Sequence, residues 1–321
     1  MEGALFHVQK NGKVGFINKK GQVIIDFEFD GASHFSEGIA RVFYKDSVGC
    51  INTKGHLAIP IQYEDMRAFS EGLAAVKVTE KWGYINKQGE IIIPPMFYVA
   101  DKFQNGFAKV REDMFTAGSF INKEGRTVLA KRVALTSAYC EELINCKEED
   151  EKWGYMNISG EIVVRPTFAY AHPFYEGKAA VEPVPLKRKH KRDEHFYGFI
   201  DKNGEMVIPP IYQGADLKFS EDLCAVWNDG FGYIDPAGEL VIPYEFNLGQ
   251  HFLEDMACVQ LTENGKYGFI NRAGSTIIQP IFDSANSFEN GLAAVYLGKQ
   301  FGKTLSGYIN KNGDYIWEPS R

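Results

Sequence analysis

The segment LAAVKVTEKWGYINKQGEIIIP, from Leu73 to Pro94, contains the pattern of the whole chain, because the same order of residue types recurs nine times. Each copy holds a small apolar segment, a polar turn, an aromatic-Gly-aromatic-Ile-Asn segment, a two-residue spacer, a Gly and a β-branched run. The copies follow one another at a spacing of roughly 35 residues, which is typical of repeat architectures. The sequence therefore predicts an all-β fold built from tandem repeats.

The most regular element of the repeat is Asn or Asp followed three places later by Gly. Asn or Asp at the first position of a turn can accept hydrogen bonds through its side chain, and Gly at the fourth position can adopt a positive φ. Such a string between two apolar runs is typical of a type I turn that closes a hairpin with a Gly bulge. The pairs are Asn18/Gly21, Asn52/Gly55, Asn86/Gly89, Asn122/Gly125, Asn157/Gly160, Asp201/Gly204, Asp235/Gly238, Asn271/Gly274 and Asn310/Gly313.

A strand is predicted on each side of every turn, for example at 83–86 and 91–93. The runs after the turns are apolar without alternation, which is expected of strands covered on both faces, here by neighbouring repeats. Proline follows in most copies, and because proline donates no hydrogen bond we expect strand pairing to stop there. These prolines are Pro60, Pro94, Pro166, Pro209, Pro243 and Pro280.

A connector with an aromatic anchor, such as Phe69, leads from each proline through Ser-Glu-Gly or a variant into a strand of small residues. Ala74, Ala75 and Gly83 are predicted to leave room for large aromatic side chains of an adjacent unit. Each unit is then a three-stranded β-meander plus a connector, and the connector could itself supply a fourth strand.

We expect these units to form one continuous array over residues 1–321. An open, curved solenoid is favoured, because nine hairpins but eight connectors are present and an open array accepts any number of repeats. A β-propeller-like ring is the alternative, since the order of elements within the repeat is also that of a propeller blade.

The middle of the chain, residues 130–195, departs from the pattern at two places. The connector 130–143 lacks the Pro and the Gly and contains better helix formers, so it is predicted to be a short helix or a weak joint. The loop 182–195 is about ten residues longer than its counterparts, which long loops permit at little cost in stability. If one place is specialised, we expect it in this region.

The strings KWGYIN at 81–86 and KWGYMN at 152–157, together with the Gly-Glu-Ile turn exit, resemble the WG (KWG) repeats, a family of tandem β repeats found mostly in bacterial proteins. The resemblance covers essentially the whole chain, although Trp stands in only two copies. It implies a repeat protein without a general catalytic activity, and it provides no functional residues to carry over.

The bulk composition and the cysteines place limits on the class of protein. A formal net charge of −7 argues against a chain whose overall field attracts nucleic acid or anionic lipid. The five cysteines are odd in number and three of them replace apolar residues of other copies, so we expect buried free thiols. Neither a signal peptide nor a membrane-spanning stretch is found, and a cytoplasmic protein is expected.

Motifs for catalysis, cofactors or metals are not found, so we expect no enzyme and no bound cofactor. The aromatic residues at the Trp position, Trp82, Trp153, Phe231 and Tyr267, form either the core between repeats or an exposed ladder that stacks on sugar rings. The core is favoured, because other copies have Val at this position, and Val keeps the hydrophobicity but lacks a ring face.

The sharpest local feature is a basic run in the long loop, formed by Lys187, Arg188, Lys189, Lys191 and Arg192. This run is a possible partner-binding site, or else a solvated tip that pairs with the acidic tip 148–151 of the preceding unit.

From these observations we expect a non-catalytic binding or scaffold protein, a monomer, whose extended surface engages another protein and no specific nucleic acid. The alternatives are carbohydrate or cell-envelope binding through aromatic hairpins and a hydrolase with an unrecognised cleft.

Overall fold

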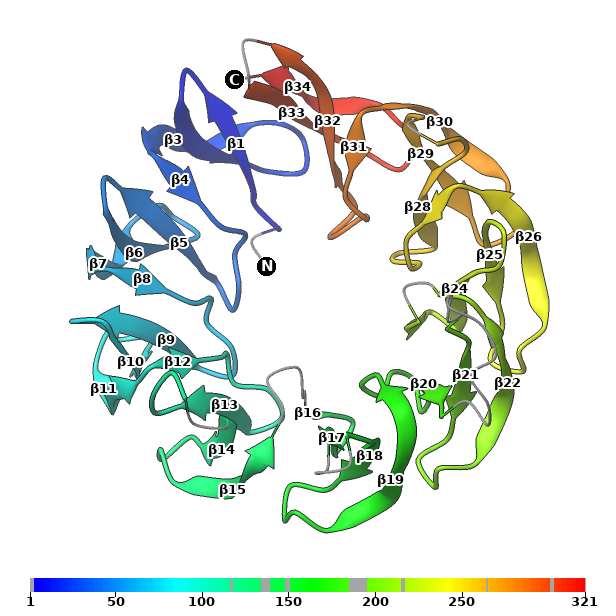
Figure 1. Ribbon diagram of the computed structural model, residues 1–321. Coiled ribbons are helices and arrows are strands. Elements are labelled where there is room, and N and C mark those ends of the chain that lie inside the picture. The colour runs from blue at the N-terminus through cyan, green and yellow to red at the C-terminus, as the bar shows by residue number, and fades with distance from the viewer. Residues whose placement is uncertain are drawn as a thin grey trace. The chain divides into compact units, whose positions relative to one another are not determined.

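All regular elements in the part of the chain that the structure describes are β-strands, and successive strands there pair antiparallel (Figure 1). The computed structural model describes residues 3–115, 118–133, 139–147, 151–184, 195–214, 217–263, 265–300 and 303–320. By internal contacts the chain divides into two units, Met1–Thr136 with Ile316–Arg321, and Ser137–Tyr315. The all-β repeat class predicted from the sequence is confirmed.

The strands of the first unit are grouped into one sheet per repeat. The sheet orders are β1-β2-β3, β4-β5-β6-β7, β8-β9-β10-β11 and β12-β13-β14-β15. Their bounds are β1 Phe6–Lys10, β2 Lys13–Ile17, β3 Val23–Phe29, β4 Gly31–Ala32, β5 Ile39–Tyr44, β6 Ser47–Asn52, β7 Leu57–Tyr63, β8 Asp65–Met66, β9 Leu73–Val78, β10 Lys81–Asn86, β11 Ile91–Phe97, β12 Val99–Ala100, β13 Phe107–Arg111, β14 Gly118–Asn122 and β15 Thr127–Val133.

The second unit repeats this arrangement, except that one sheet has seven strands, β16 to β22. The others are β23-β24-β25-β26, β27-β28-β29-β30 and β31-β32-β33-β34, although β34 from Ile316 on belongs to the first unit. The bounds are β16 Tyr139–Cys140, β17 Leu143–Lys147, β18 Trp153–Met156, β19 Ile162–Ala171, β20 Ala179–Pro183, β21 Tyr197–Ile200, β22 Met206–Tyr212, β23 Phe219–Ser220, β24 Leu223–Trp227, β25 Phe231–Ile234, β26 Leu240–Phe246, β27 Leu248–Gly249, β28 Met256–Gln260, β29 Tyr267–Asn271, β30 Thr276–Phe282, β31 Ser284–Ala285, β32 Ala293–Gln300, β33 Lys303–Ile309 and β34 Tyr315–Ser320.

The three-stranded meander is present in each repeat, and the connector adds a short fourth strand, the possibility that the sequence left open. In the third sheet this strand is β8, which pairs with β9 at Asp65↔Lys77 and Met66↔Val76. The described residues of the connector 130–143 belong to strands β15, β16 and β17 or, at Glu141 and Glu142, to the turn between β16 and β17, so the expected helix is not found in them. Residues 134–138 lie outside the described part.

The Asx-x-x-Gly turns form as predicted. At the first turn the Gly21 N–H donates to the Asn18 carbonyl at 3.0 Å, and the Asn18 side-chain oxygen accepts from the N–H groups of Lys20 at 2.9 Å and Gln22 at 3.1 Å. The turn glycines have φ between 75° and 87°, a region in which other residues are strained. The local turn chemistry therefore sets the hairpin register.

The prediction that proline ends each outer strand is wrong. Pro94 and Pro95 lie inside β11, at a bulge: Tyr84 pairs with Ile93 and Trp82 with Phe97, so two residues of β10 oppose four of β11. Proline is tolerated because β11 is an edge strand, whose outward N–H groups need no partner within the sheet. Proline therefore blocks further pairing at this edge and does not terminate the strand.

The bulge also explains Gly83, for which the prediction was wrong. An added β-carbon would lie 2.5 Å from the carbonyl oxygen of Ile93 and 2.6 Å from the nitrogen of Pro95. Gly83 thus makes room for the backbone of its own outer strand, not for an aromatic side chain of another unit. The same close approach occurs at Gly15, Gly49, Gly154, Gly198, Gly232 and Gly268.

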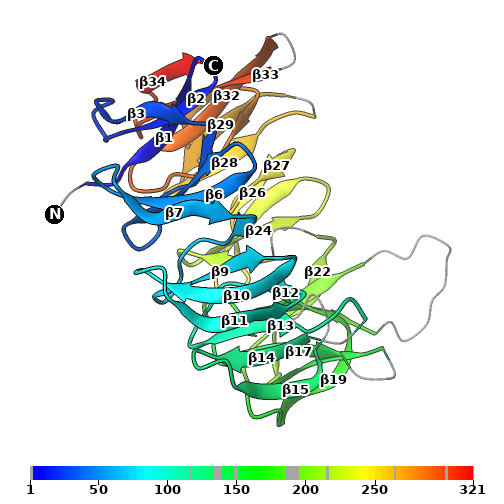
Figure 2. The same cartoon turned by 90° about the vertical axis from the view of Figure 1, so that its left-hand side faces the viewer.

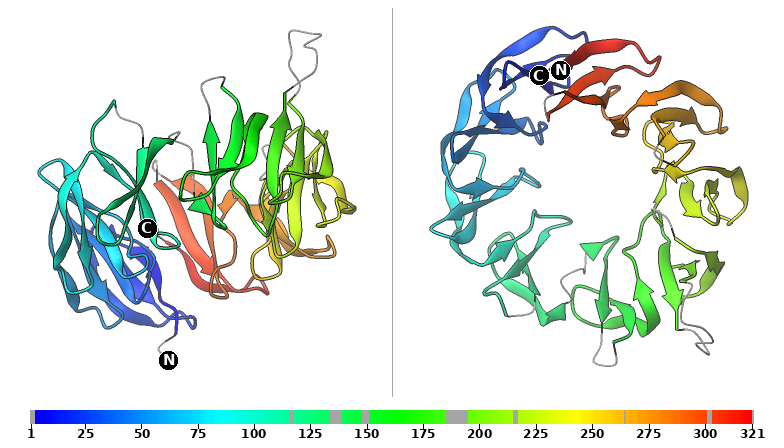
Figure 3. Two further views of the ribbon diagram at one scale, coloured as in Figure 1. Left: turned by 90° about the horizontal axis from the view of Figure 1, so that it is seen from below. Right: turned by 45° about the horizontal axis from the view of Figure 1, so that its top comes forward.

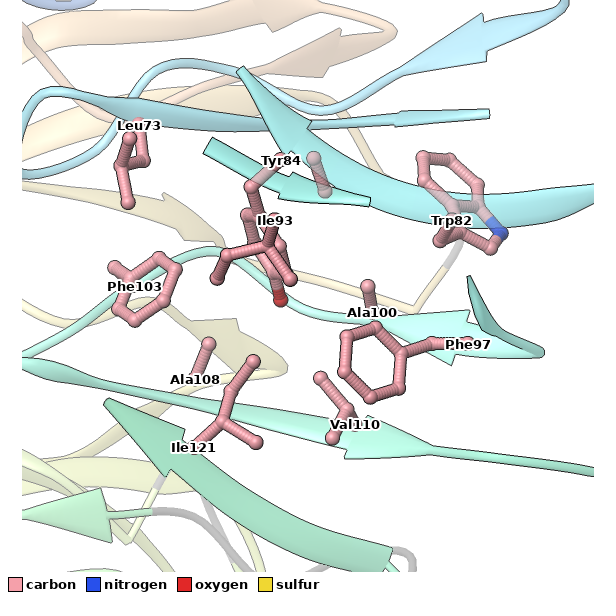
Figure 4. Close-up of a cluster of buried hydrophobic side chains, with 11 residues drawn as sticks. Leu73, Trp82, Tyr84, Ile93, Phe97, Ala100, Phe103, Ala108, Val110 and Ile121 are labelled. Carbon is pink, nitrogen blue, oxygen red and sulfur yellow. The ribbon is translucent and has the colours of Figure 1, made fainter. Parts of the chain in front are cut away.

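The hydrophobic core lies between successive sheets. Figure 4 shows one such cluster. Trp82, Tyr84 and Phe97 of the third sheet lie in it together with Ala100 and other residues of the next sheet. Figure 2 shows β9, β10 and β11 beside β12, β13 and β14, the strands that enclose this cluster. Trp82 and Trp153 are only 7% and 5% exposed. The core interpretation is confirmed for Trp82 and Trp153, whose rings are not available to stack on a sugar, whereas Phe231 and Tyr267 are partly buried against the core clusters of their repeats.

The outer strands are less buried than their apolar sequences predicted. Ile93 is buried, but Ile91 and Ile92 are 55% and 43% exposed. The neighbouring repeat covers only the third residue of the run: the turn glycine Gly125 would place a β-carbon 3.2 Å from Ile93 Cγ2. The expectation of burial on both faces is therefore wrong for the first two residues.

A ladder of glutamates links the Ser-Glu-Gly turns of successive repeats. Glu37 accepts a hydrogen bond from the Gly72 N–H at 3.0 Å, and Glu71 accepts one from the Gly106 N–H at 2.9 Å. Lys123 Nζ also lies 3.2 Å from Glu71. Burial by itself would raise the pKa of Glu71, but the hydrogen bond from Gly106 and the charge of Lys123 outweigh it and lower the pKa. The glutamate ladder therefore has a structural role.

The C-terminal segment belongs to the first unit. Figure 3 shows it in red beside the dark-blue strands of the first sheet, and the rings of Trp317 and Phe27 lie 5.9 Å apart between centroids. The first sheet thus has the last residues of the chain against its outer strand.

Candidate functional site

The basic run predicted as a partner site, Lys187, Arg188, Lys189, Lys191 and Arg192, lies outside the described residues. The base of its loop is described: Glu182 and His195 face each other, with 2.7 Å between Glu182 Oε1 and His195 Nδ1. Of the acidic tip 148–151 only Glu151 is described, and it pairs with Lys147 of its own hairpin. The pairing of the two tips stays a prediction.

A different group of polar residues emerges when the strands are compared by register. In each repeat one residue pairs across the hairpin with the equivalent of Tyr84, as Ala75 does with Tyr84 itself. This residue is small in most copies. The occupants in chain order are His7, Arg41, Ala75, Lys109, Asn145, Ala180, Ala225, Cys258 and Ala294. Three long polar side chains, His7, Arg41 and Lys109, therefore stand in the first unit where the other copies have Ala, Cys or, once, Asn. Aligning the copies residue by residue would have found them; motif searches did not.

Arg41 shows how a large residue fits at this position. Arg41 pairs with Cys50, and at the equivalent positions of the third repeat Ala75 pairs with Tyr84. The large residue of the pair therefore lies on the earlier strand in the second repeat and on the later strand in the third. The Arg41 guanidinium donates to the Met66 carbonyl at 2.6 Å, much as the Tyr84 hydroxyl donates to a carbonyl of the next connector.

Four cationic side chains of the first unit interact as two neighbouring pairs, Arg41 with Arg67 and Lys109 with Arg111, and we call these four the unit 1 cation cluster. Each guanidinium lies over an aromatic ring, with 5.9 Å from Arg41 to Phe43, 5.1 Å from Arg67 to Trp82 and 5.6 Å from Arg111 to Tyr98. Such cation–π contacts hold a guanidinium in place.

The members of the cluster act on one another electrostatically. The pKa of Arg41 is lowered by burial, raised by Asp65 and lowered again by the charge of Arg67. Burial likewise lowers the pKa of Lys109, Asp101 raises it, and Arg111 lowers it. Asp65 favours the charged form of Arg41, and Asp101, which lies 3.8 Å from Lys109 Nζ, favours the charged form of Lys109.

The two histidines of the first unit also lie together. The rings of His7 and His34 meet edge to face at 4.6 Å between centroids, and His7 Nδ1 is buried without a hydrogen-bond partner. Burial first, and the charge of His34 second, lower the pKa of His7 to about 4. His7 is therefore neutral at pH 7.

A second surface feature is the set of half-exposed aliphatic side chains at the first two positions of the outer strands, which we call the outer rows. In the first unit they are Val23, Ile24, Leu57, Ile91, Ile92 and Val128. In the second unit they are Ile162, Val163, Met206, Val207, Leu240, Val241 and Ile277. Most of these residues are β-branched or Leu on an edge strand, and natural proteins usually keep edge strands from exposing such side chains.

Metal-binding and membrane features were also considered. In the described ranges there is no group of three or more His, Cys, Asp or Glu side chains placed to hold a metal ion. The same ranges hold no helix of the length and apolarity needed to cross a membrane. The five cysteines are free and buried, as predicted.

Comparison with known proteins identifies the repeat. Residues 15–46, 49–82, 82–113, 153–182, 197–230, 231–267 and 267–301 match the family described as WG containing repeat. None of the curated proteins matches the chain.

A eukaryotic initiation factor is similar to this chain at the level of the fold. The crystal structure of a eukaryotic initiation factor matches with a TM-score of 0.64 and 9% identity, over 98% of this chain and 95% of that one. Virginiamycin B lyase from Staphylococcus aureus matches with a TM-score of 0.33 and 13% identity, over 96% of each chain. A protein of unknown function from Bacteroides caccae matches with a TM-score of 0.27 and 17% identity, over 64% of this chain and 93% of that one.

Proposed function

The chain belongs to the family of WG containing repeat proteins, and from this premise we propose that it is a non-catalytic binding protein that engages another protein through its outer rows. The observation that carries the proposal is the recurrence of exposed aliphatic pairs, such as Ile91 and Ile92, at the same two positions of successive outer strands. Clustered exposed apolar side chains on a soluble protein are typical of interaction surfaces.

The sequence of the array supports a role beyond folding for these side chains. The equivalents of Ile91 include Thr127 and Thr276, at the same place after the turn. A polar residue is thus compatible with the turn and the strand. The aliphatic residues of the other copies are therefore not needed by the local fold, and contact with a partner would explain them.

Carbohydrate recognition through aromatic hairpins has less support, because Trp82 and Trp153 are buried. A cytoplasmic location and a monomeric state remain the expectations derived from the sequence.

Variants copied from the chain's own repeats test the proposal. Leu57→Thr with Ile91→Thr changes the first unit, and Met206→Thr with Leu240→Thr changes the second. Lys20→Thr with Lys54→Thr is the matched control, since both lysines are exposed at turns near the outer rows. A photoreactive residue at position 92 would trap the bound partner in the cells that make the protein.

The expected result is a defined covalent adduct that disappears in the outer-row variants and persists in the lysine control. An adduct of equal yield in all variants, or no adduct from any outer-row position, would overturn the proposal. Unchanged thermal unfolding of the variants would show that the loss is not caused by misfolding.

A further inference from the structure

Two donors of the unit 1 cation cluster are unsatisfied. The Nε atoms of Arg41 and Arg111 are buried and have no hydrogen-bond partner. A buried donor without an acceptor costs about 1–3 kcal/mol, so native structures seldom keep one without a reason. Both donors belong to guanidinium groups, whose natural acceptors are carboxylate and phosphate oxygens.

The four cations belong to three successive repeats of the first unit. Arg67 interacts electrostatically with Arg41 on one side and with Tyr84 on the other. Asp101 acts on Tyr84 and lies 3.8 Å from Lys109 Nζ, and Lys109 in turn interacts with Arg111. A ligand with several negative charges along its length can therefore meet more than one of the cations.

Main-chain carbonyls accept hydrogen bonds from two arginines of the cluster. The bond from Arg41 to the Met66 carbonyl explains one guanidinium nitrogen, and the weaker bond from Arg111 to the Met114 carbonyl, at 3.4 Å, explains another. Repulsion between Arg41 and Arg67 remains. In the second unit the equivalent positions hold Asn145, Ala180, Ala225, Cys258 and Ala294, so the fold itself requires no cation there.

We propose that the unit 1 cation cluster binds a run of carboxylates in an acidic peptide segment of a partner protein. Guanidinium groups and carboxylates form planar, two-pronged pairs. Single-stranded nucleic acid is disfavoured as the occupant, because its bases need free ring faces, whereas Trp82 is buried and already has Arg67 over its ring. This inference extends the proposed function by naming the chemistry of one partner segment, and it rests on residues that the outer rows do not include.

The variants that test the proposal again copy the chain's own repeats. Arg41→Ala with Cys50→Tyr recreates the Ala75–Tyr84 pair, and Arg67→Gln recreates Gln250 of a later connector. Lys19→Gln with Lys20→Gln removes two charges from an exposed turn of the same unit and serves as the matched control. The probes are fluorescein-labelled hexaglutamate and, separately, a labelled thymidine hexanucleotide, with binding followed by fluorescence anisotropy at two salt concentrations.

The expected result is salt-sensitive binding of hexaglutamate that weakens at least tenfold in the triple variant of Arg41, Cys50 and Arg67 and stays unchanged in the lysine control. Three outcomes overturn the proposal. They are no binding of hexaglutamate by the wild-type chain, equal binding by the triple variant and the lysine control, and tighter binding of the hexanucleotide than of the peptide. The outer-row variants should bind hexaglutamate normally, which separates failure of this site from failure of the proposed function.

Discussion

Replacing Gly83 by Ala is expected to destabilise the chain by about 3 kcal/mol, at the upper end of the cost of overpacking a well-packed site. The added β-carbon would lie 2.5 Å from the Ile93 oxygen, 2.6 Å from the Pro95 nitrogen and 2.8 Å from the Pro94 carbonyl carbon. All three are main-chain atoms of the bulge in β11, so rotation of a side chain cannot relieve the contact. Strands β10 and β11 must separate, or the bulge must be lost.

Gly72→Ala is the matched control. Gly72 has a φ of 85° and nothing within 4 Å of an added β-carbon, so only the backbone cost of a side chain at positive φ applies, about 1–2 kcal/mol. Urea denaturation measures both free energies of unfolding, and amide hydrogen exchange locates the loss in β10 and β11. Gly83 itself does not have a positive φ, so without the steric clash an Ala there would stabilise by roughly 0.4–1 kcal/mol. A Gly83→Ala variant as stable as the wild type would refute the explanation.

Three further predictions concern buried or paired groups. Glu71→Ala should cost about 1–2 kcal/mol in urea denaturation, because the Gly106 N–H loses its charged acceptor, whereas Glu124→Ala, at an exposed turn, should cost almost nothing. His7 has a pKa lowered to about 4, by burial first and by His34 second, so the unfolded chain binds the proton first. As the pH is lowered from roughly 6.5 to 4, its contribution to the free energy of unfolding should fall by about 1.4 kcal/mol per pH unit. His7→Ala should therefore flatten the plot of stability against pH in this range, and parallel plots for the wild type and the variant would contradict the prediction. Burial raises the pKa of Cys50 and of Cys258 to about 12, so a thiol reagent at pH 8 should modify neither in the native chain and all five cysteines in urea.

The sequence predicted those features of the fold that depend on neighbouring residues. Asn18 and Gly21 lie in one turn, and their chemistry alone determines its hydrogen bonds. Trp82 was predicted to lie in the core because other copies carry Val at its position. Both predictions use information that is present within a single repeat or in the comparison of repeats at one position.

The features that the sequence did not predict depend on contacts between strands. Gly83 and Pro94 are eleven residues apart in the sequence, and only the bulged register of β10 and β11 shows that one makes room for the other. The exposure of Ile91 depends on how far the next repeat's turn reaches across β11. Arg41 was not recognised as unusual because its significance depends on the register that pairs it with Cys50.

The exchange of Arg41 and Cys50 for Ala75 and Tyr84 leads to a last prediction. If the two pairs fill the same space, Ala75→Arg alone should overpack the site, and Tyr84→Cys alone should leave a cavity and remove the hydroxyl bond to the Asp101 carbonyl. The double variant should recover about 2 kcal/mol relative to the sum of the single changes, because each change supplies what the other lacks. A double-mutant cycle in urea measures this coupling. Strict additivity would mean that the arginine at position 41 depends on surroundings other than its strand partner. The variant Arg41→Ala with Cys50→Tyr could then not be expected to preserve the packing of the site.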